Sequence, residues 1–486
     1  MTLTSALNSA MSGLNAASRA SQLVSSNVAN ALTPGYARRT LSVSSSSTGN
    51  GAGVQIDGIT RQIDAQVISD RRLAGSEFGY RANTSKYLNR VEDLIGTPDQ
   101  QGSLSANLAN FENSLITAAS RPDAIERLDS AALGALDLAN SINEVADGIQ
   151  SARTDADRSI ADQVIRLNDT LQAVEELNNR ITASSTRNAD TSALQDQRQV
   201  LIDEISEMVP VRTVDKEFGA VALYSTGGAI LLDVRAAEVG FEPTNTVTPY
   251  MSVEDGTLSG LTVNGYSVNT SSASGRLHGG TLGAQFEIRD ELAPKAQTQI
   301  DALARDLIER FESSAVDPTL AAGQPGLFTD AGAALDPAVE AGLANRLSLN
   351  ALVDPTSGGE PWRMRDGLGA TAPGPSGNAM LLNALSDALT QTRLPSSGDF
   401  GTSELTATGI AAGLASQVAS SRLREDQQLS FASAQFYELT ELELVNGVDT
   451  DVELQNLMIV EQAYAANARV IDTVEQMFNT LMRIGE

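Results

Sequence analysis

Apolar and small residues recur in steps of three and four near both ends of the chain, which is the spacing of a heptad seam along a helix. The N-terminal seam comprises Leu3, Leu7, Ala10, Leu14, Ala17, Ser21, Val24, Val28 and Ala31. The C-terminal seam comprises Leu457, Val460, Tyr464, Asn467, Ile471, Val474, Phe478 and Leu481. Each pattern predicts a helix of roughly 33 residues, about 50 Å long. Because neither helix can shield its stripe alone, we expect the two to pair as one intramolecular coiled coil.

The N-terminal helix lacks the charged outer face that a surface helix normally carries. Arg19 is the only charged residue among the first 37. We therefore expect its back to be covered by further copies of the same chain in an assembly. The alternative is an internal coiled coil that does no more than close one domain.

Turn and cap signals bound these two helices. Thr33-Pro34-Gly35-Tyr36 places Pro and Gly as in a type II turn, which ends the first helix. Asn446-Gly447 ends the helix before the last one, and Thr450 with Glu453 predicts a capping box for the last one.

The middle of the chain changes period twice. Residues 61–208 follow a helical period, with stripes such as Leu104 to Leu115 and Ile160 to Val174. Residues 209–285 alternate with period two, and Gly227-Gly228 and Asn264-Gly265 each predict a hairpin between two short strands. Helical periodicity then returns, apart from a Gly-, Pro- and Asp-rich interval at 316–378.

These patterns predict an elongated α+β multidomain protein: a long helical bundle with an inserted central β-rich domain at the end far from the termini. The four predicted parts are a discontinuous terminal coiled-coil domain (1–60 with 446–486), a helical domain (61–208 with 286–315 and 380–445), a β-rich domain (209–285), and a loop-rich or small irregular module (316–379). Within the first part, residues 41–60 are predicted to be loop with a short strand at Val54 and Ile56.

Composition narrows the classes of function. With 33 Lys and Arg against 61 Asp and Glu, the net charge of −28 repels phosphate backbones and argues against nucleic-acid binding. The chain has no cysteine, no apolar run long enough to insert in a membrane, and no pattern of a cleaved signal peptide. A cytoplasmic protein fits this pattern, as does one secreted without a cleaved signal.

No constellation of residues supports catalysis, a cofactor or a metal site. His278 is the only histidine and lacks zinc-binding partners. Asp449, Asp451 and Glu453 resemble the start of a calcium loop, but Leu454 and Val460 stand where its Gly and closing Glu belong. The glycines of 49–53 lack the Lys of a phosphate loop, 44–47 is a solvated serine run, and Trp362 is a local anchor.

Two motifs carry a specific resemblance. Asn27-Val-Ala-Asn-Ala-Leu-Thr-Pro-Gly-Tyr-Ala-Arg38, with Asn27, Asn30, Thr33, Pro34, Gly35 and Tyr36 as its key positions, resembles the N-terminal motif of flagellar rod, hook and hook-associated proteins. The stretch from Val452 to Arg469 is similar to their C-terminal motif, and Leu194 to Val209 is similar to the hook-associated members in particular.

The resemblance implies a structural subunit that joins the flagellar hook to the filament. Such subunits leave the cell unfolded through the flagellar type III export system and assemble as a ring of copies at the hook tip, outside the cell. The implied partners are other copies, the hook protein, the second hook-associated protein at the junction, and an export chaperone that binds the C-terminal segment.

Two alternatives stay open from the sequence. One is a hook or distal-rod subunit, which a β-rich segment directly after residue 60 would favour. The other is an extracellular enzyme or adhesin module carried in 209–378, which would require a pocket with convergent polar groups.

Overall fold

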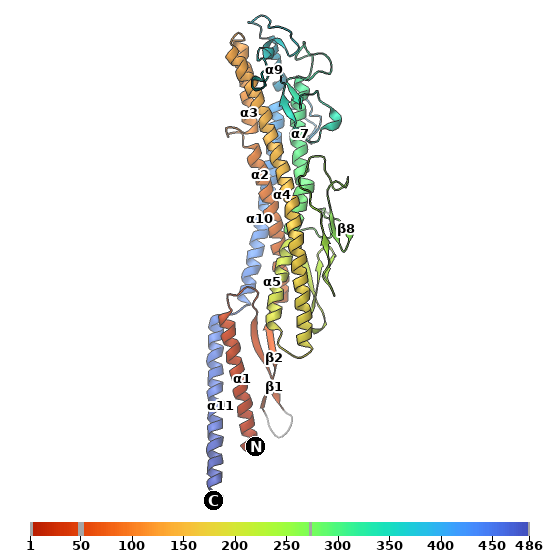
Figure 1. The fold of residues 1–486 in the computed structure, drawn as a ribbon. Coiled ribbons are helices and arrows are strands. Elements are labelled where there is room, and N and C mark those ends of the chain that lie inside the picture. Colours follow the sequence, from red (N-terminus) through yellow and green to blue (C-terminus); the bar gives the residue numbers. More distant parts are fainter. Residues whose placement is uncertain (1–2, 47–52, 272–274, 485–486) are drawn as a thin grey trace.

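The computed structural model describes residues 3–46, 53–271 and 275–484 of an elongated, mostly helical molecule (Figure 1). Both ends of the chain lie at one end of the long axis. The opposite end is formed by the segment around α9 (Met380–Thr390). The predicted α+β class is confirmed, with long helices and four small antiparallel sheets in the described part. None of the described helices is long and apolar enough to cross a membrane.

The terminal part contains two helices and one hairpin. Helix α1 spans Leu3–Ala29 and α11 spans Thr450–Ile484, so the two helices are not of the equal length that was predicted. Strands β1 (Arg38–Ser46) and β2 (Gly53–Gln62) pair antiparallel, with a register shift after Ser42. The short strand predicted at Val54 and Ile56 is confirmed as part of β2. The prediction of loop was wrong for 41–46 and for the rest of 53–60, because cross-strand pairing outweighs the low strand propensity of the serines. Residues 47–52 lie outside the described residues.

The body is built from helices, most of them long. They are α2 (Ala65–Ile95), α3 (Leu104–Ser120), α4 (Ile125–Ser185), α5 (Ser192–Met208), the short α6 (Gly280–Glu287), α7 (Ala293–Phe311) and α10 (Ala407–Val445), with α9 at the tip. Helix α4 has 61 residues and spans about 90 Å, so it forms the backbone of the body. A π-helical turn (Ile288–Leu292) joins α6 to α7.

The predicted stripes form the main core of the body. Leu104, Leu108, Phe111 and Leu115 on α3 are fully buried against α4 and α7. Helical structure between 380 and 445 is interrupted at 391–406, where a single bridge joins Arg393 to Leu405. The continuous helical pattern expected from 380 onward therefore holds only for α9 and α10.

The β-rich segment consists of two three-stranded sheets. They are β3 (Val211–Asp215), β4 (Val221–Ser225) and β5 (Ile230–Leu232), and β6 (Val239–Gly240), β7 (Leu261–Val263) and β8 (Tyr266–Val268). Both predicted hairpins are confirmed, as β4 with β5 and β7 with β8.

Two predictions about this segment were wrong. Its buried residues share one cluster with Ile160, Val164 and Leu167 of α4 and with Ile202 of α5, so it has no core of its own. It also lies along the side of the helical body, beside α4, and not at the far end (Figure 1). Strands this short expose too little apolar area to fold alone, and they need the helices to cover one face.

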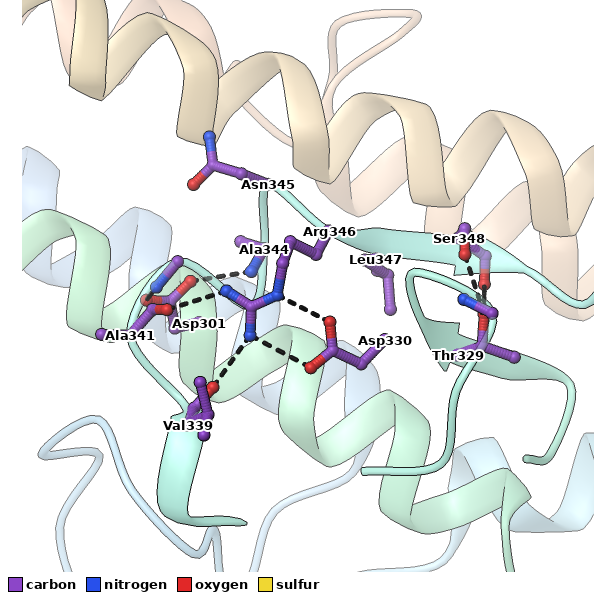
Figure 2. Close-up of polar contacts among 12 residues, drawn as sticks. Asp301, Thr329, Asp330, Val339, Ala341, Ala344, Asn345, Arg346, Leu347 and Ser348 are labelled. Atoms are coloured by element: carbon purple, nitrogen blue, oxygen red, sulfur yellow. Dashed lines mark hydrogen bonds and ion pairs between the residues drawn. The ribbon is translucent and has the colours of Figure 1, made fainter. Parts of the chain in front are cut away.

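The far end is occupied by residues 316–379, which contain only short elements: β9 (Phe328–Asp330), β10 (Leu347–Leu349), α8 (Arg363–Asp366) and three-residue 3-10 turns at Pro337–Val339 and Pro355–Ser357. Figure 2 shows how polar contacts hold this segment on α7. The Asp301 carboxylate accepts the backbone N–H groups of Gly342 and Ala344 at 2.7 and 2.8 Å, and the Arg346 guanidinium binds Asp330 and the carbonyl of Val339. The irregular backbone is thus anchored from α7 and contributes Phe328 and Leu347 to the main core.

Candidate assembly interface

Helices α1 and α11 lie side by side and antiparallel (Figure 1). Near the body, the Asn27 Nδ2 donates to Glu453 Oε2 at 3.0 Å. In the middle, Gly13 faces the Asn467 side chain so closely that a Cβ would lie 2.8 Å from its Oδ1. At the free end, Leu3 and Met477 line one shallow apolar cavity of about 410 Å³. Small residues on α1 allow this close approach of the two helices.

The contact buries only part of the predicted seams. Ala10, Ala17, Val24 and Val474 are buried. Leu3, Leu7, Leu14, Ser21, Leu457, Val460, Asn467 and Ile471 are half-buried. Val28, Tyr464, Phe478 and Leu481 are exposed, because α11 continues past Leu3 and because two helices cover only one side of each other.

Asn467 lies opposite Gly13 in the antiparallel register of the two helices. Its Nδ2 donates to the Ala463 carbonyl of its own helix, at 2.9 Å. This polar seam residue thus forms a hydrogen bond within α11.

Helix α11 leaves many large apolar residues exposed to water. They include Leu454, Met458, Ile459, Val470, Met477, Phe478, Leu481 and Met482. Soluble proteins rarely expose this many large apolar side chains on one helix unless another molecule covers some of them. The terminal pair therefore buries part of each helix and leaves large apolar residues of α11 uncovered.

The motif from Asn27 to Tyr36, which spans the end of α1 and the turn after it, is built around Asn27, whose side chain is 1% exposed. Its Nδ2 donates to the Arg39 carbonyl at 2.9 Å, and its Oδ1 accepts from the Arg39 N–H at 3.0 Å and from the Tyr36 hydroxyl at 2.9 Å. The Arg39 guanidinium lies 4.8 Å from the centre of the Tyr36 ring. One buried amide thus joins the end of α1 to the start of β1.

The predicted type II turn is confirmed. The Tyr36 N–H donates to the Thr33 carbonyl at 3.1 Å, and Gly35 has φ = 75°. A side chain at Gly35 would be strained, and its Cβ would lie 2.5 Å from Val200 on α5. Asn30 donates to the Ser26 carbonyl and accepts from Thr33, while Pro34 is exposed. The turn therefore presses against the body at α5.

Glu453 is a key residue that the sequence reading placed incorrectly. Its carboxylate is buried and accepts from Asn27 and, at 2.7 Å, from the Arg38 Nε. The N-cap of α11 is Asp449, whose Oδ1 accepts the N–H groups of Asp451 and Val452, so the predicted Thr450–Glu453 capping box was wrong. Residues 1–56 carry three Arg and no Asp or Glu, whereas residues 452–486 carry five acids and two Arg, and this charge asymmetry was the available signal for the contact.

Asp196 on α5 was missed altogether. It accepts from the Arg39 Nη2 at 2.6 Å, from the Arg61 Nε at 2.8 Å and from the Ala37 N–H at 3.3 Å. Burial lowers the pKa of Arg61, and the neighbouring Asp196 carboxylate opposes that shift. Both strands of the hairpin are thereby tied to one carboxylate of the helical body.

The other candidate positions take structural places. His278 stacks edge-on against Tyr80, with 5.2 Å between ring centres, and burial lowers its pKa. Trp362 is half-buried beneath the Arg363 guanidinium. Within the described ranges, no group of three or more His, Cys, Asp or Glu residues could hold a metal ion. Most of the glycine stretch 49–53 and the end of the serine run 44–47 lie outside the described residues.

Three family models match the chain. They are the flagellar hook-associated protein FlgK helical domain (residues 88–327), the flagellar basal body rod FlgEFG protein C-terminal (445–484) and the flagella basal body rod protein (7–36). The first match runs from within α2 through α7 and includes the β-rich segment, the second covers α11, and the third covers most of α1 with its turn.

Curated relatives agree with these matches. The chain is 28% identical over 273 residues to flagellar hook-associated protein 1 of Salmonella typhimurium, covering 53% of this chain and 48% of the relative. It is 24% identical over 330 residues to that of Escherichia coli K12, covering 64% of this chain and 57% of the relative. The chain thus spans about half the length of the curated relatives it matches. A solved structure, the flagellar hook junction protein FlgK from Burkholderia pseudomallei, has 19% identity and a TM-score of 0.44, covering 55% of this chain and 46% of that one.

Proposed function

Because the chain belongs to the family of flagellar rod, hook and hook-associated proteins, we propose that it is a structural subunit of the junction between hook and filament. It acts by assembly and not by catalysis. Copies form a ring at the hook tip, outside the cell, and the terminal helices pack there as a coiled coil within each copy and against neighbouring copies.

One observation carries this proposal: the number of large apolar residues that α11 exposes to water. The residues from Leu454 to Met482 that face water in the single chain need a covering surface, and equivalent helices of neighbouring copies supply one of the same character. The motif formed by Asn27, Asn30, Thr33, Pro34, Gly35 and Tyr36 holds α1 and β1 at a fixed angle to the body, which sets the direction in which the pair projects.

The helices that follow the hairpin favour the hook-associated role over a hook or distal-rod subunit. A β-rich segment directly after residue 60 would favour those subunits, but α2 to α5 come first in this chain. This helical region largely coincides with the matched helical domain of hook-associated proteins. The helical body therefore supports a role at the junction between hook and filament over a role in the hook or distal rod.

The proposed partners follow from the same assignment. They are the hook protein on the cell-proximal side of the ring, the second hook-associated protein on the filament side, and an export chaperone that covers the exposed apolar residues of α11 before assembly. The chain passes through the flagellar type III export system unfolded. The absence of cysteine suits this route, since no disulfide can form before export.

Deletion of the gene, with and without the chain supplied in trans, tests the proposal. We expect electron micrographs of deleted cells to show hooks that lack filaments, with free filament protein in the medium. Supplying the chain should restore filaments, and gold-labelled antibody against it should mark the hook tip. Filaments of normal length and number on deleted cells would contradict the junction role.

A further inference from the structure

The body contains two separate cores of buried apolar residues, and the long α4 runs through both (Figure 1). The main core includes Leu128 to Ala156 of α4 and is completed by α2, α3, α7, α9, α10 and the far-end segment. The second core includes Ile160 to Val174 of α4 and is completed by α5, the β-rich segment and α6. Among the described residues, none belongs to both cores. The apolar packing of the body is therefore divided along one continuous helix.

Charged residues stand in the apolar stripe of α4 where the main core ends and the second core begins. Arg153 and Asp157 lie between Ile149 and Ile160 in this stripe, and both are buried. The Asp157 Oδ1 accepts from the Arg289 Nη1 at 2.7 Å, and both of these side chains are fully buried. The Arg153 Nε donates to the Arg289 carbonyl at 2.7 Å. A buried layer of charge thus separates the two cores.

The helix that faces this layer leaves the regular α-helical form at the same level. Arg289 lies in the π-helical turn that joins α6, which contributes to the second core, to α7, which contributes to the main core. A π turn interrupts the regular hydrogen-bond ladder of a helix. The Arg153 guanidinium also donates to the carbonyls of Thr248 and Met251, in the loop between β6 and β7. The π turn and this loop therefore meet at the border that the charges mark on α4.

The charged layer joins the two cores less firmly than apolar packing holds each of them. The desolvation of two buried charges offsets most of their attraction, so a buried ion pair adds little net stability. Apolar burial, by contrast, stabilises in proportion to the area removed from water. The second core draws on fewer helices and on short strands, so its opening costs less free energy than the opening of the main core.

We propose that the body opens in two steps. Residues 157–287 unfold first, as one cooperative unit around the second core, while the main core stays folded. The opening stops at the pair formed by Asp157 and Arg289. Local opening of proteins proceeds in contiguous cooperative units of this kind, each with its own free energy. The inference concerns the single chain and does not depend on the proposed role at the hook tip.

Hydrogen exchange of the purified chain, read by mass spectrometry in rising guanidinium chloride, tests the two steps. Helix α4 supplies an internal comparison between its first half (128–149) and its second half (160–174). We expect the amides of the second half to exchange through an opening of lower free energy and smaller denaturant slope, because less surface becomes exposed. A single free energy and a single slope over both halves would overturn the inference.

Two buried arginines provide a matched pair of substitutions. Arg289 belongs to the charged layer, whereas Arg310 lies on α7 beside the main core and pairs with the buried Asp306. Arg289→Met leaves Asp157 buried without this partner, so it should speed exchange in the second half of α4 by about a hundredfold or more and leave the first half unchanged. Arg310→Met should speed exchange in the first half by a similar factor and leave the second half unchanged.

The responses of the two variants decide between one cooperative unit and two. If each substitution speeds exchange equally in both halves of α4, the body opens as a whole and the inference is overturned. Loss of protection throughout the body in Arg289→Met overturns it as well. Complete exchange of the second half beside a protected first half supports it. Hook-tip imaging takes no part in these measurements, so the proposed function stands or falls separately.

Discussion

Helices α4 and α11 are both long, and both carry an apolar stripe with helical spacing, yet the two stripes lie in different environments. The stripe of α4, from Leu128 to Ile181, is buried along almost its whole length by helices and strands of the same chain. That of α11 is covered on one side by α1 and exposed on the other. The body thus buries its apolar stripes within one chain, whereas the terminal pair leaves large apolar residues exposed.

The largest expected effect comes from a charge at the contact of the terminal pair. Ile471 is half-buried on α11. Ile471→Asp would place a carboxylate in a surface that must become dry on assembly, at a cost of several kcal/mol. We expect loss of hook-tip incorporation and of swimming, with an unchanged fold of the body. Ile165→Asp on α4, where the isoleucine is exposed, is the matched control and should assemble. Normal filaments with Ile471→Asp would contradict the role of this helix.

Two phenylalanine substitutions, one in the body and one on α11, should have opposite effects on stability and on filament formation. Phe111 is fully buried in the body, so Phe111→Ala should lower the free energy of unfolding by about 3–5 kcal/mol. Phe478 is exposed on α11, so Phe478→Ala should change it by less than about 0.5 kcal/mol. Filament formation should instead suffer from Phe478→Ala. Denaturant unfolding and counts of filament-bearing hooks measure the two properties, and equal destabilisation of the purified chain by both changes would argue against the comparison.

The free energy of unfolding of the body should depend on pH through the buried carboxyl of Asp301. Burial raises the pKa of this carboxyl to about 6, above the value of about 3.9 in an unfolded chain. The folded state therefore holds the proton more tightly between pH 4 and 6, so this group favours folding below that window and its contribution is lost as pH rises through it. The expected loss is roughly 2–3 kcal/mol. In Asp301→Asn this slope should disappear from urea unfolding curves taken across the window. A slope that is unchanged in the variant would assign the pH dependence to other groups.

The smallest expected effect concerns Glu453, which links the terminal pair to the hairpin. Glu453→Gln keeps the shape of the side chain but weakens its bonds to Asn27 and Arg38, at a cost of about 1–2 kcal/mol. Because the loss is local, we expect faster proteolytic release of residues 450–484 with little change in the melting of the body. Glu461→Gln, at an exposed position of the same helix, is the control. Equal rates of proteolytic release for the two variants would show that Glu453 does not link the terminal pair to the hairpin.

The sequence predicted the helices and the two hairpins of the β-rich segment because these depend on neighbours close along the chain. The spacing of Leu104 to Leu115 and the Asn264-Gly265 pair are local signals of this kind. Strand β1 and its pairing with β2 were missed, although a short strand at Val54 and Ile56 was predicted, since the serine-rich β1 is stabilised by pairing and by anchoring of the hairpin at Asp196.

The candidate site was predicted in part for the same reason. The seams and the turn at Gly35 follow from local spacing, but the register of α1 on α11 depends on which small residues face each other. Asp196 and Arg39 are separated by 157 positions, and no periodic pattern marks either as a partner of the other.

The anchoring of the hairpin at Asp196 has a mechanical consequence. Arg39 on β1 and Arg61 on β2 are paired across the hairpin, and both bind the Asp196 carboxylate. Glu453 of α11 binds the neighbouring Arg38 of β1. A twist of the terminal pair relative to the body would therefore strain all of these bonds. Because Asp196 lies on α5, which packs along the 61-residue α4, the same bonds connect the terminal pair to the longest helix of the body.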